Sequence, residues 1–274
     1  MKEQILHAIE NVQDTSPLVH SITNFVVMNV TANALLAAHA SPLMAHAAEE
    51  MDDLTDIDSA LVLNIGTPDP AWLESMELAG KLMRAKGKPV VLDPVGAGAS
   101  RLRTEASLRL LDMVRPQIVR GNASEIMALA SAIRKAERLP ASSSSPATKG
   151  VDSLNDSRDA VDSARFLAER FSCVVSISGE RDFVTDGNTV LMVEGGSPLM
   201  PLVTGMGCSA SAVTGAYAAC AEPLIAAAAA MAVFASAGEK AGKLAHGPGT
   251  FLPHFLDELY AVDKEDAAGR VKKL

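Results

Sequence analysis

The chain has 274 residues and a formal net charge of −9, because 33 Asp and Glu residues outnumber 24 Lys and Arg residues. Hydrophobic residues make up 48% of the chain and aromatic residues only 4%. This balance excludes disordered, collagen-like and coiled-coil proteins, and an acidic chain with few aromatic rings is a poor partner for nucleic acid. An anionic small molecule is compatible with this charge only if the protein neutralises it locally.

Nothing in the composition suggests export or a membrane. The cysteines Cys173, Cys208 and Cys220 are scattered without metal-ligand spacing, which indicates a reducing, cytoplasmic location. The N-terminal residues mix charges into the apolar positions, so no secretory signal is expected. The alanine-rich stretch between Glu222 and Glu239 is shorter than the roughly 20 residues of a membrane span, and we expect a buried helix.

In chain order, the first feature is a polar group ahead of an apolar helical segment. His20, Thr23 and Asn24 are explained structurally as helix N-capping residues, although Asn24 could instead reach a ligand. Short runs rich in Val, Ile and Leu follow, and they alternate with segments of helical period such as 72–86 and 160–171. We expect these runs to be strands buried on both faces of a sheet, at 60–65, 89–93, 117–119 and 173–177.

This alternation predicts an α/β fold with a doubly wound, mostly parallel central sheet and helices on both faces. The residues Asp186-Gly187-Asn188, between two short apolar runs, predict an antiparallel hairpin at one edge. The serine-rich segment 140–150 is expected to be a surface loop within one domain, 1–274. Residues 205–242 predict two closely packed buried helices broken near Glu222, and the charged tail 262–274 is expected to be frayed.

The most informative motif is TGMGCS, in which a Gly-x-Gly turn opens directly into a small-residue helix. Backbone N–H groups at such a helix N-terminus bind anions, although the glycines Gly205 and Gly207 could also serve only a tight turn. Cys208 lies in the first turn, where the helix dipole is expected to lower the pKa of its thiol. Simple packing is the alternative role for this cysteine.

Other polar residues lie at the predicted strand ends, where ligand sites of open parallel sheets gather. Asp93 closes one strand and suits Mg²⁺ or a proton better than a simple loop cap would. Arg120 follows the next strand and offers a cation for phosphate, while Glu125, in the first turn of a helix capped by Asn122 or Ser124, offers a second carboxylate.

A further strand end, SISGERD, carries a small hydroxyl residue beside a glycine, which could approach a nucleotide. Carboxylates, a cation and a helix N-terminus together are what phosphoryl transfer requires, since that reaction depends on positioning and charge stabilisation. The chain has no Walker A motif, and its Gly-Ala-Gly-Ala segment lacks the Rossmann spacing. A purely structural reading would need every one of these strand-end motifs to be a coincidence.

The order and spacing of these motifs resemble those of the hydroxyethylthiazole kinase family of the ribokinase-like superfamily. The resemblance rests on HSITNFVVMNVTAN, ASPLMAHAAEEM, LVLNIGT, VVLDPVGAGAS, VRGNASEI, GVDS, ISGERD and LVTGMGCS, from about residue 19 to about residue 249. It implies a kinase that uses ATP and Mg²⁺ to phosphorylate the primary alcohol of 4-methyl-5-(2-hydroxyethyl)thiazole in thiamine salvage. It also implies a homotrimer with active sites at subunit interfaces.

By this resemblance, Met44 and Gly205 would contact the thiazole. ATP would be bound by a second group of residues: Arg120, Ser178, Asn24 and Gly207. Asp93 and Glu125 would serve magnesium and the phosphates.

Cys208 falls where most of the superfamily carries the aspartate that takes the hydroxyl proton. At pH 7 a thiol is a poorer general base than a carboxylate. This is tolerable because the loose transition state of phosphoryl transfer needs little early deprotonation. Met206, His39 and Ser178 depart from the family pattern, and Met206 puts in doubt how much its position contributes to phosphate binding. The alternatives are a kinase for another heteroaromatic alcohol such as hydroxymethylpyrimidine, or a ligand-binding regulator without turnover.

Overall fold

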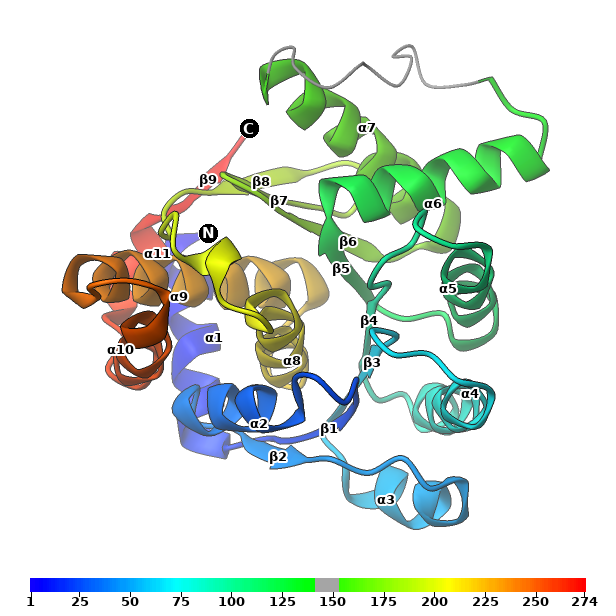
Figure 1. The fold of residues 1–274 in the computed structure, drawn as a ribbon, viewed down its shortest axis with the longest axis horizontal. Coiled ribbons are helices and arrows are strands. Elements are labelled where there is room, and N and C mark those ends of the chain that lie inside the picture. The colour runs from blue at the N-terminus through cyan, green and yellow to red at the C-terminus, as the bar shows by residue number, and fades with distance from the viewer. Residues whose placement is uncertain (141–152) are drawn as a thin grey trace.

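The structure is a computed structural model that describes residues 1–140 and 153–274. In this part of the chain the centre is a nine-stranded sheet with the strand order β2-β1-β3-β4-β5-β6-β7-β8-β9 (Figure 1). The strands are β1 (Leu18–Ile22), β2 (Ser41–Leu43), β3 (Ala60–Asn64), β4 (Val90–Asp93), β5 (Ile118–Asn122), β6 (Val174–Ser178), β7 (Asp182–Thr185), β8 (Val190–Val193) and β9 (Val271–Lys273). Strands β1 to β6 pair in parallel, and β7, β8 and β9 add antiparallel pairs.

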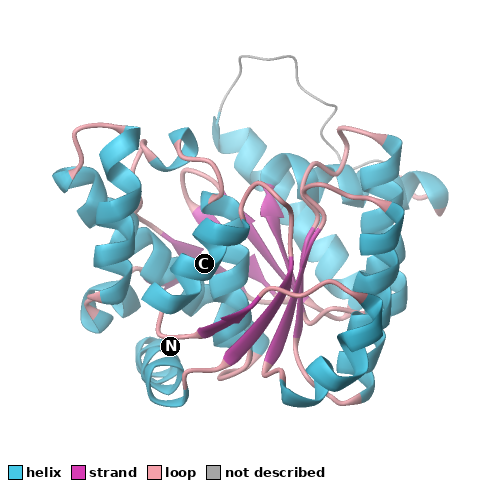
Figure 2. Cartoon of the chain, turned by 60° about the horizontal axis from the view of Figure 1, so that its bottom comes forward, coloured by secondary structure: helices cyan, strands magenta, loops and turns pink. Residues whose placement is uncertain are grey.

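Helices cover both faces of this sheet (Figures 1 and 2). One face carries α4 (Pro70–Ala85), α5 (Arg101–Val114), α6 (Ala123–Ala136) and α7 (Ser153–Phe171), with α3 (Met51–Ile57) beside α4. The other face carries α8 (Met206–Ala218) and α9 (Pro223–Leu244), and behind them lie α1 (Lys2–Thr15), α2 (Met28–Ala37), α10 (Pro248–Tyr260) and α11 (Lys264–Gly269). The doubly wound α/β fold with helices on both faces is therefore confirmed.

A separate apolar cluster fills the space on each side of the sheet. On the side of α8 and α9 the helices are built from Ala, Ser and Gly, and Gly215 shows why: a Cβ added there would lie 2.5 Å from a methyl group of Val62 in β3. Helix α9 is long and apolar enough to cross a membrane, but 78% of its apolar window is buried within the fold. The expected buried helix is therefore present.

The predicted strands correspond to β3, β4, β5 and β6, and the hairpin to β7 and β8. Two strands, β1 and β2, were not predicted, because β1 carries buried polar residues and β2 has only three residues. The prediction of a frayed tail is wrong, since residues 264–273 form α11 and β9, and β9 pairs with β8. The loop predicted at 140–150 lies, apart from Pro140, outside the described residues.

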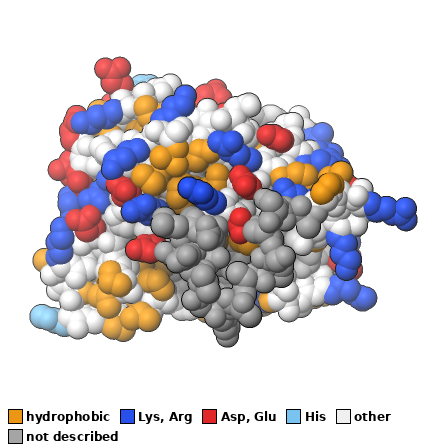
Figure 3. Space-filling view, turned by 90° about the horizontal axis from the view of Figure 1, so that it is seen from above, with side chains coloured by type: hydrophobic (Ala, Val, Ile, Leu, Met, Phe, Trp, Pro, Cys, Tyr) orange, Lys and Arg blue, Asp and Glu red, His pale blue; other side chains and the backbone are white. Residues whose placement is uncertain are grey.

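The surface seen from above in Figure 3 carries Lys and Arg side chains interspersed with Asp and Glu around small apolar areas. Ion pairs at the antiparallel edge follow the same pattern, since Glu194 contacts both Arg181 and Lys272. Charges of opposite sign thus neutralise each other locally along this part of the surface.

Candidate active site

Three polar side chains meet where β1, β3 and β4 end. Asn24, just after β1, donates from Nδ2 to Asn64 Oδ1 at 2.8 Å, and Asn64 Nδ2 donates to Asp93 Oδ2 at 2.8 Å. Asn64 and Asp93 are also direct partners in the register of β3 and β4. The strand order reverses between β1 and β3, so the cluster lies at the topological switch point of the sheet, where open α/β sheets bind ligands.

Asp93 is held from both the sheet and a helix. Ser211 Oγ of α8 donates to Asp93 Oδ2 at 2.6 Å, and the Asp93 side chain is buried. Burial raises the pKa of this carboxyl group to about 7, although the charge of Arg120 and the hydrogen bonds from Ser211 and Asn64 oppose the rise. The carboxylate is thus incompletely compensated by its protein partners, and a cation beside it would favour its charged form.

The turn before α8 requires glycine. Gly205 has φ +89°, and a Cβ there would lie 2.8 Å from Val30 Cγ1. No side chain caps α8, so its first N–H groups have no side-chain acceptor. The anion site that the sequence predicts at this helix N-terminus stays a prediction. Arg120 Nη1 donates to the carbonyl of Gly207 at 2.9 Å, which brings the guanidinium against the first helical turn.

Arg120 lies inside β5 rather than directly after it, and its side chain is 6% exposed. Its Nε is buried without a hydrogen-bond partner. A buried guanidinium with an unused donor is costly unless a ligand supplies an acceptor.

Cys208 lies in the first turn of α8, close to this cluster. Asn24 Nδ2 donates to its Sγ at 3.6 Å, so the amide of Asn24 contacts both Asn64 and the thiol. Burial, followed by the charge of Asp93, raises the pKa of the thiol. The expected direction was the opposite, because the dipole argument ignored desolvation and a neighbouring carboxylate.

Glu125 performs a structural task with both of its oxygens. Glu125 Oε2 accepts from the N–H of Asn122 at 2.9 Å while Asn122 Oδ1 accepts from the N–H of Glu125 at 2.9 Å, which is a capping box. Glu125 Oε1 accepts from the N–H of Gly96 at 2.8 Å and so ties the loop after β4 to α6. Of the two predicted caps, Asn122 is the one used.

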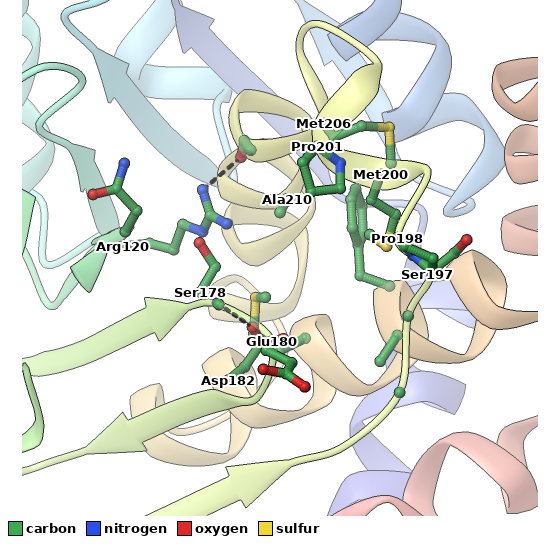
Figure 4. Close-up of a pocket in the computed structure, with 18 residues that line it drawn as sticks. Arg120, Ser178, Glu180, Asp182, Ser197, Pro198, Met200, Pro201, Met206 and Ala210 are labelled. Carbon is green, nitrogen blue, oxygen red and sulfur yellow. Dashed lines mark hydrogen bonds between the residues drawn. The ribbon is translucent and has the colours of Figure 1, made fainter. Parts of the chain in front are cut away.

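A pocket of 840 Å³ opens beside this cluster (Figure 4). Arg120, Ser178 and Asp182 line one side of it, and the opposite side is apolar, with residues that include Met200 and Met206. Asp182 Oδ1 accepts from the N–H of Gly179 at 3.0 Å, and burial raises its pKa to about 6. A polar end and an apolar end suit a ligand that combines phosphate with a flat ring.

The predicted site residues are only partly brought together. Arg120, Ser178 and Gly207 line the pocket, while Asn24, Asp93 and Cys208 form the adjacent hydrogen-bonded cluster. Met44 follows β2 at the edge of the sheet and does not belong to the residues that line the described pocket.

Sequence reasoning missed Asn64, Ser211 and Asp182. Asn64 closes a strand in the same way as Asp93, and Ser211 lies one turn after Cys208 on α8, so position along each element was the available signal. Asp182 lies in the SGERD segment, which was noted only for its serine and glycine.

The described part of the chain contains no group of three or more His, Cys, Asp or Glu side chains placed to hold a metal ion. Asp93 and Glu125 lie close enough for the charge of Glu125 to act on Asp93, and carboxylate oxygens are the hard donors that Mg²⁺ prefers. Both oxygens of Glu125 already accept backbone N–H groups.

Known proteins resemble this chain along its whole length. The sequence model of the hydroxyethylthiazole kinase family matches residues 9–265. The hydroxyethylthiazole kinase of Brachyspira hyodysenteriae is 51% identical over 273 residues, which cover 100% of this chain and 99% of the relative. That of Nitratidesulfovibrio vulgaris is 54% identical over 271 residues, covering 98% and 97%.

Solved structures agree with this assignment. The hydroxyethylthiazole kinase of Pyrococcus horikoshii aligns with a TM-score of 0.87 at 39% identity and covers 100% of both chains. The pyridoxal kinase of Staphylococcus aureus, in complex with ADP, aligns with a TM-score of 0.58 at 18% identity over 82% of this chain and 88% of its own, which is a likeness of fold. The fold is thus the ribokinase-like one that the motifs predicted, and the chain belongs to the hydroxyethylthiazole kinase family.

Proposed function

We propose that this chain transfers the γ-phosphoryl group of ATP to the primary alcohol of 4-methyl-5-(2-hydroxyethyl)thiazole, a salvage step toward thiamine. The observation that carries the proposal is the convergence of Arg120 and the uncapped head of α8 on one pocket beside the buried carboxylate of Asp93. A cation, free backbone donors and a carboxylate are the parts that phosphoryl transfer uses. The names of the relatives supply the acceptor alcohol.

On the ATP side, the unused Nε of Arg120 faces no protein acceptor and would meet a phosphate oxygen. The N–H groups at Gly207, the hydroxyl of Ser178 and the amide of Asn24 would complete the ATP contacts. Asp93 and Glu125 would hold Mg²⁺, which when bound neutralises phosphate charge and orients the transferred group.

On the acceptor side, Gly205 and Met44 would contact the thiazole, and Cys208 would receive the hydroxyl proton. The raised pKa of its thiol makes Cys208 a poor base at neutral pH. Such a base suffices because the loose transition state of phosphoryl transfer needs little early deprotonation.

The assembly proposed for this function is a homotrimer with active sites at its interfaces. Met44 lies beside the edge strand β2, away from the pocket lining, and α2, which contacts β2, presents Leu36 at 57% exposure. An acceptor site completed by a second copy at this edge would explain both features. Sedimentation of Leu36→Glu tests the assembly: it should dissociate, while Leu102→Glu, a 52% exposed leucine on α5, should not.

The proposed compartment is the reducing cytoplasm, since Cys173, Cys208 and Cys220 are all free thiols. As one domain, the chain would act on small molecules rather than on nucleic acid or membranes.

The decisive experiment combines purified protein, ATP, Mg²⁺ and the thiazole alcohol, with hydroxymethylpyrimidine in a parallel reaction. Phosphorylated thiazole is the expected product, detected by mass. Phosphorylation of the pyrimidine alone would assign the alternative acceptor. Calorimetric binding of the thiazole without any product would make the protein a regulator.

A further inference from the structure

A fully buried pair of a histidine and an aspartate side chain lies beside β1. His20 is the central residue of β1, and Asp58 follows the C-terminal end of α3; both side chains are 0% exposed. His20 Nδ1 lies 2.7 Å from Asp58 Oδ2, and His20 Nε2 lies 3.0 Å from the carbonyl oxygen of Ala45. The phosphoryl-transfer cluster uses neither residue.

The carbonyl of Ala45 determines one hydrogen of the ring. A carbonyl oxygen can only accept, so His20 Nε2 carries a hydrogen and donates it to Ala45. The contact of Nδ1 with Asp58 Oδ2 is a second hydrogen bond, and the two bonds together fix the orientation of the ring.

The Asp58 side chain depends on His20 for its hydrogen bonding. Asp58 Oδ1 is buried without a hydrogen-bond partner, so His20 supplies the contact of that carboxylate. The other charged groups at this end of α3 are engaged elsewhere: Lys86 Nζ lies 2.6 Å from Asp56 Oδ1, and Lys88 Nζ donates to the carbonyl of Asp56 at 2.7 Å.

The second donor of His20 holds a segment that matters for the acceptor. Ala45 lies between β2 and the 3-10 turn η1 (Ala48–Glu50), directly after Met44. The next residue, His46, packs on Trp72 with ring centroids 4.5 Å apart. Residues 44–46 are thus held at two points: His20 contacts Ala45, and Trp72 packs on His46.

We infer that His20, oriented by its hydrogen bond with Asp58, is a positioning residue for the acceptor alcohol: its bond to the Ala45 carbonyl sets the position of Met44. This inference rests on the proposed function, in which Met44 contacts the thiazole. Because the hydrogen bond from His20 to Ala45 acts on the acceptor side alone, it determines the affinity for the alcohol and leaves ATP binding unaffected.

Two amide substitutions separate the two bonds of the ring. In His20→Asn the amide nitrogen can occupy the place of Nδ1 and still donate to Asp58, but it does not reach Ala45. In His20→Gln the longer side chain can donate to Ala45 and withdraws from Asp58. We expect His20→Asn to raise KM for the thiazole alcohol about tenfold, the effect of one lost hydrogen bond, with KM for ATP unchanged. His20→Gln should keep both KM values close to those of the parent and lower Tm.

Asp58→Asn is a matched control that keeps the packing. Its amide can donate to Nδ1, which leaves the Nε2 hydrogen on the carbonyl of Ala45, so KM for the thiazole alcohol should stay close to that of the parent. Asp58→Ala provides a second route if His20→Asn does not fold: it removes the partner that orients the ring, and KM for the thiazole alcohol should rise as in His20→Asn.

The fluorescence of Trp72, the single tryptophan of the chain, reports the hydrogen bond between His20 and Ala45 without any turnover. Because His46 packs on Trp72, release of Ala45 should change the Trp72 emission of His20→Asn and Asp58→Ala, while His20→Gln and Asp58→Asn should resemble the parent. Met44→Ala should raise KM for the thiazole and leave the emission unchanged. If the first two variants lose Tm but retain the parent emission and thiazole KM, the pair is structural only and the inference is overturned. Failure of the parent to phosphorylate the thiazole would instead overturn the proposed function.

Discussion

Arg120 Nη1 donates a hydrogen bond of 2.9 Å to the carbonyl of Gly207, a residue 87 positions later in the chain. The bond joins the third residue of β5 to the first turn of α8. It therefore brings a fixed positive charge to the helix N-terminus, where free N–H groups already favour an anion. The two groups that we propose to hold phosphate are thus linked by one hydrogen bond.

This coupling predicts that Arg120→Lys will not preserve function although it preserves charge. Lysine has neither the planar fork that reaches the Gly207 carbonyl nor the Nε donor that Arg120 leaves unused. We expect kcat/KM for ATP to fall by about two orders of magnitude, as for loss of a buried charge-stabilising donor. Steady-state kinetics with varied ATP measure the effect, and a loss below about threefold would contradict the proposed role.

Asp93→Asn should separate stability from activity. Because burial raises the pKa of the folded carboxyl group from 3.8 to about 7, the folded state of the parent loses stability as the pH rises through that interval. Asparagine avoids the loss, so the metal-free variant should be more stable than the parent by on the order of 3 kcal/mol near pH 8 and about equal near pH 4. Phosphorylation should be abolished.

Urea unfolding in a chelator at several pH values measures the stability of Asp93→Asn, and the product assay measures its activity. Ser211→Ala, which keeps the carboxyl group of Asp93 but removes a 2.6 Å hydrogen bond to it, is the matched control and should reduce stability. A pH-independent difference between parent and Asp93→Asn would show that Asp93 does not titrate in this way.

Cys208 can be tested by changing the strength of the base. Cys208→Ala should lower kcat by about tenfold, at the low end for a general base, because the raised pKa keeps most of the thiol protonated. Cys208→Asp should retain or exceed the parent turnover, since a carboxylate is the stronger candidate at neutral pH. An alanine variant with the turnover of the parent would remove Cys208 from the proton transfer.

Gly205→Ala tests the turn in front of α8. At φ +89° an alanine is strained, and its Cβ would lie 2.8 Å from Val30 Cγ1, so we expect a loss of about 2 kcal/mol in unfolding free energy and a higher KM for the thiazole. Gly249→Ala is the control, because nothing lies within 4 Å of a Cβ added there. Equal Tm values for the two variants would contradict the argument.

Much of the fold follows from local patterns. The runs at 60–65 and 89–93 are apolar except for Asn64 and Asp93, because β3 and β4 are covered on both faces, so their sequences carry the signal of a buried strand. The apolar pattern did not predict strand β1, because β1 buries the polar residues His20 and Ser21. Polar residues of this kind indicate a loop unless the partner that satisfies them is known. That partner, Asp58, lies 38 residues away.

The sequence by itself determined the alternation of strands and helices, the polar residues at strand ends and the family, because all of these are written in consecutive residues. Only the tertiary structure decided which strand ends are neighbours, and therefore that Asn64 bridges Asn24 and Asp93. It also reversed the expected direction of the Cys208 pKa, since the cost of burial and the charge of Asp93 act through space. Hydrophobic periodicity is a local property, whereas desolvation and hydrogen-bond partnership depend on how distant segments pack together.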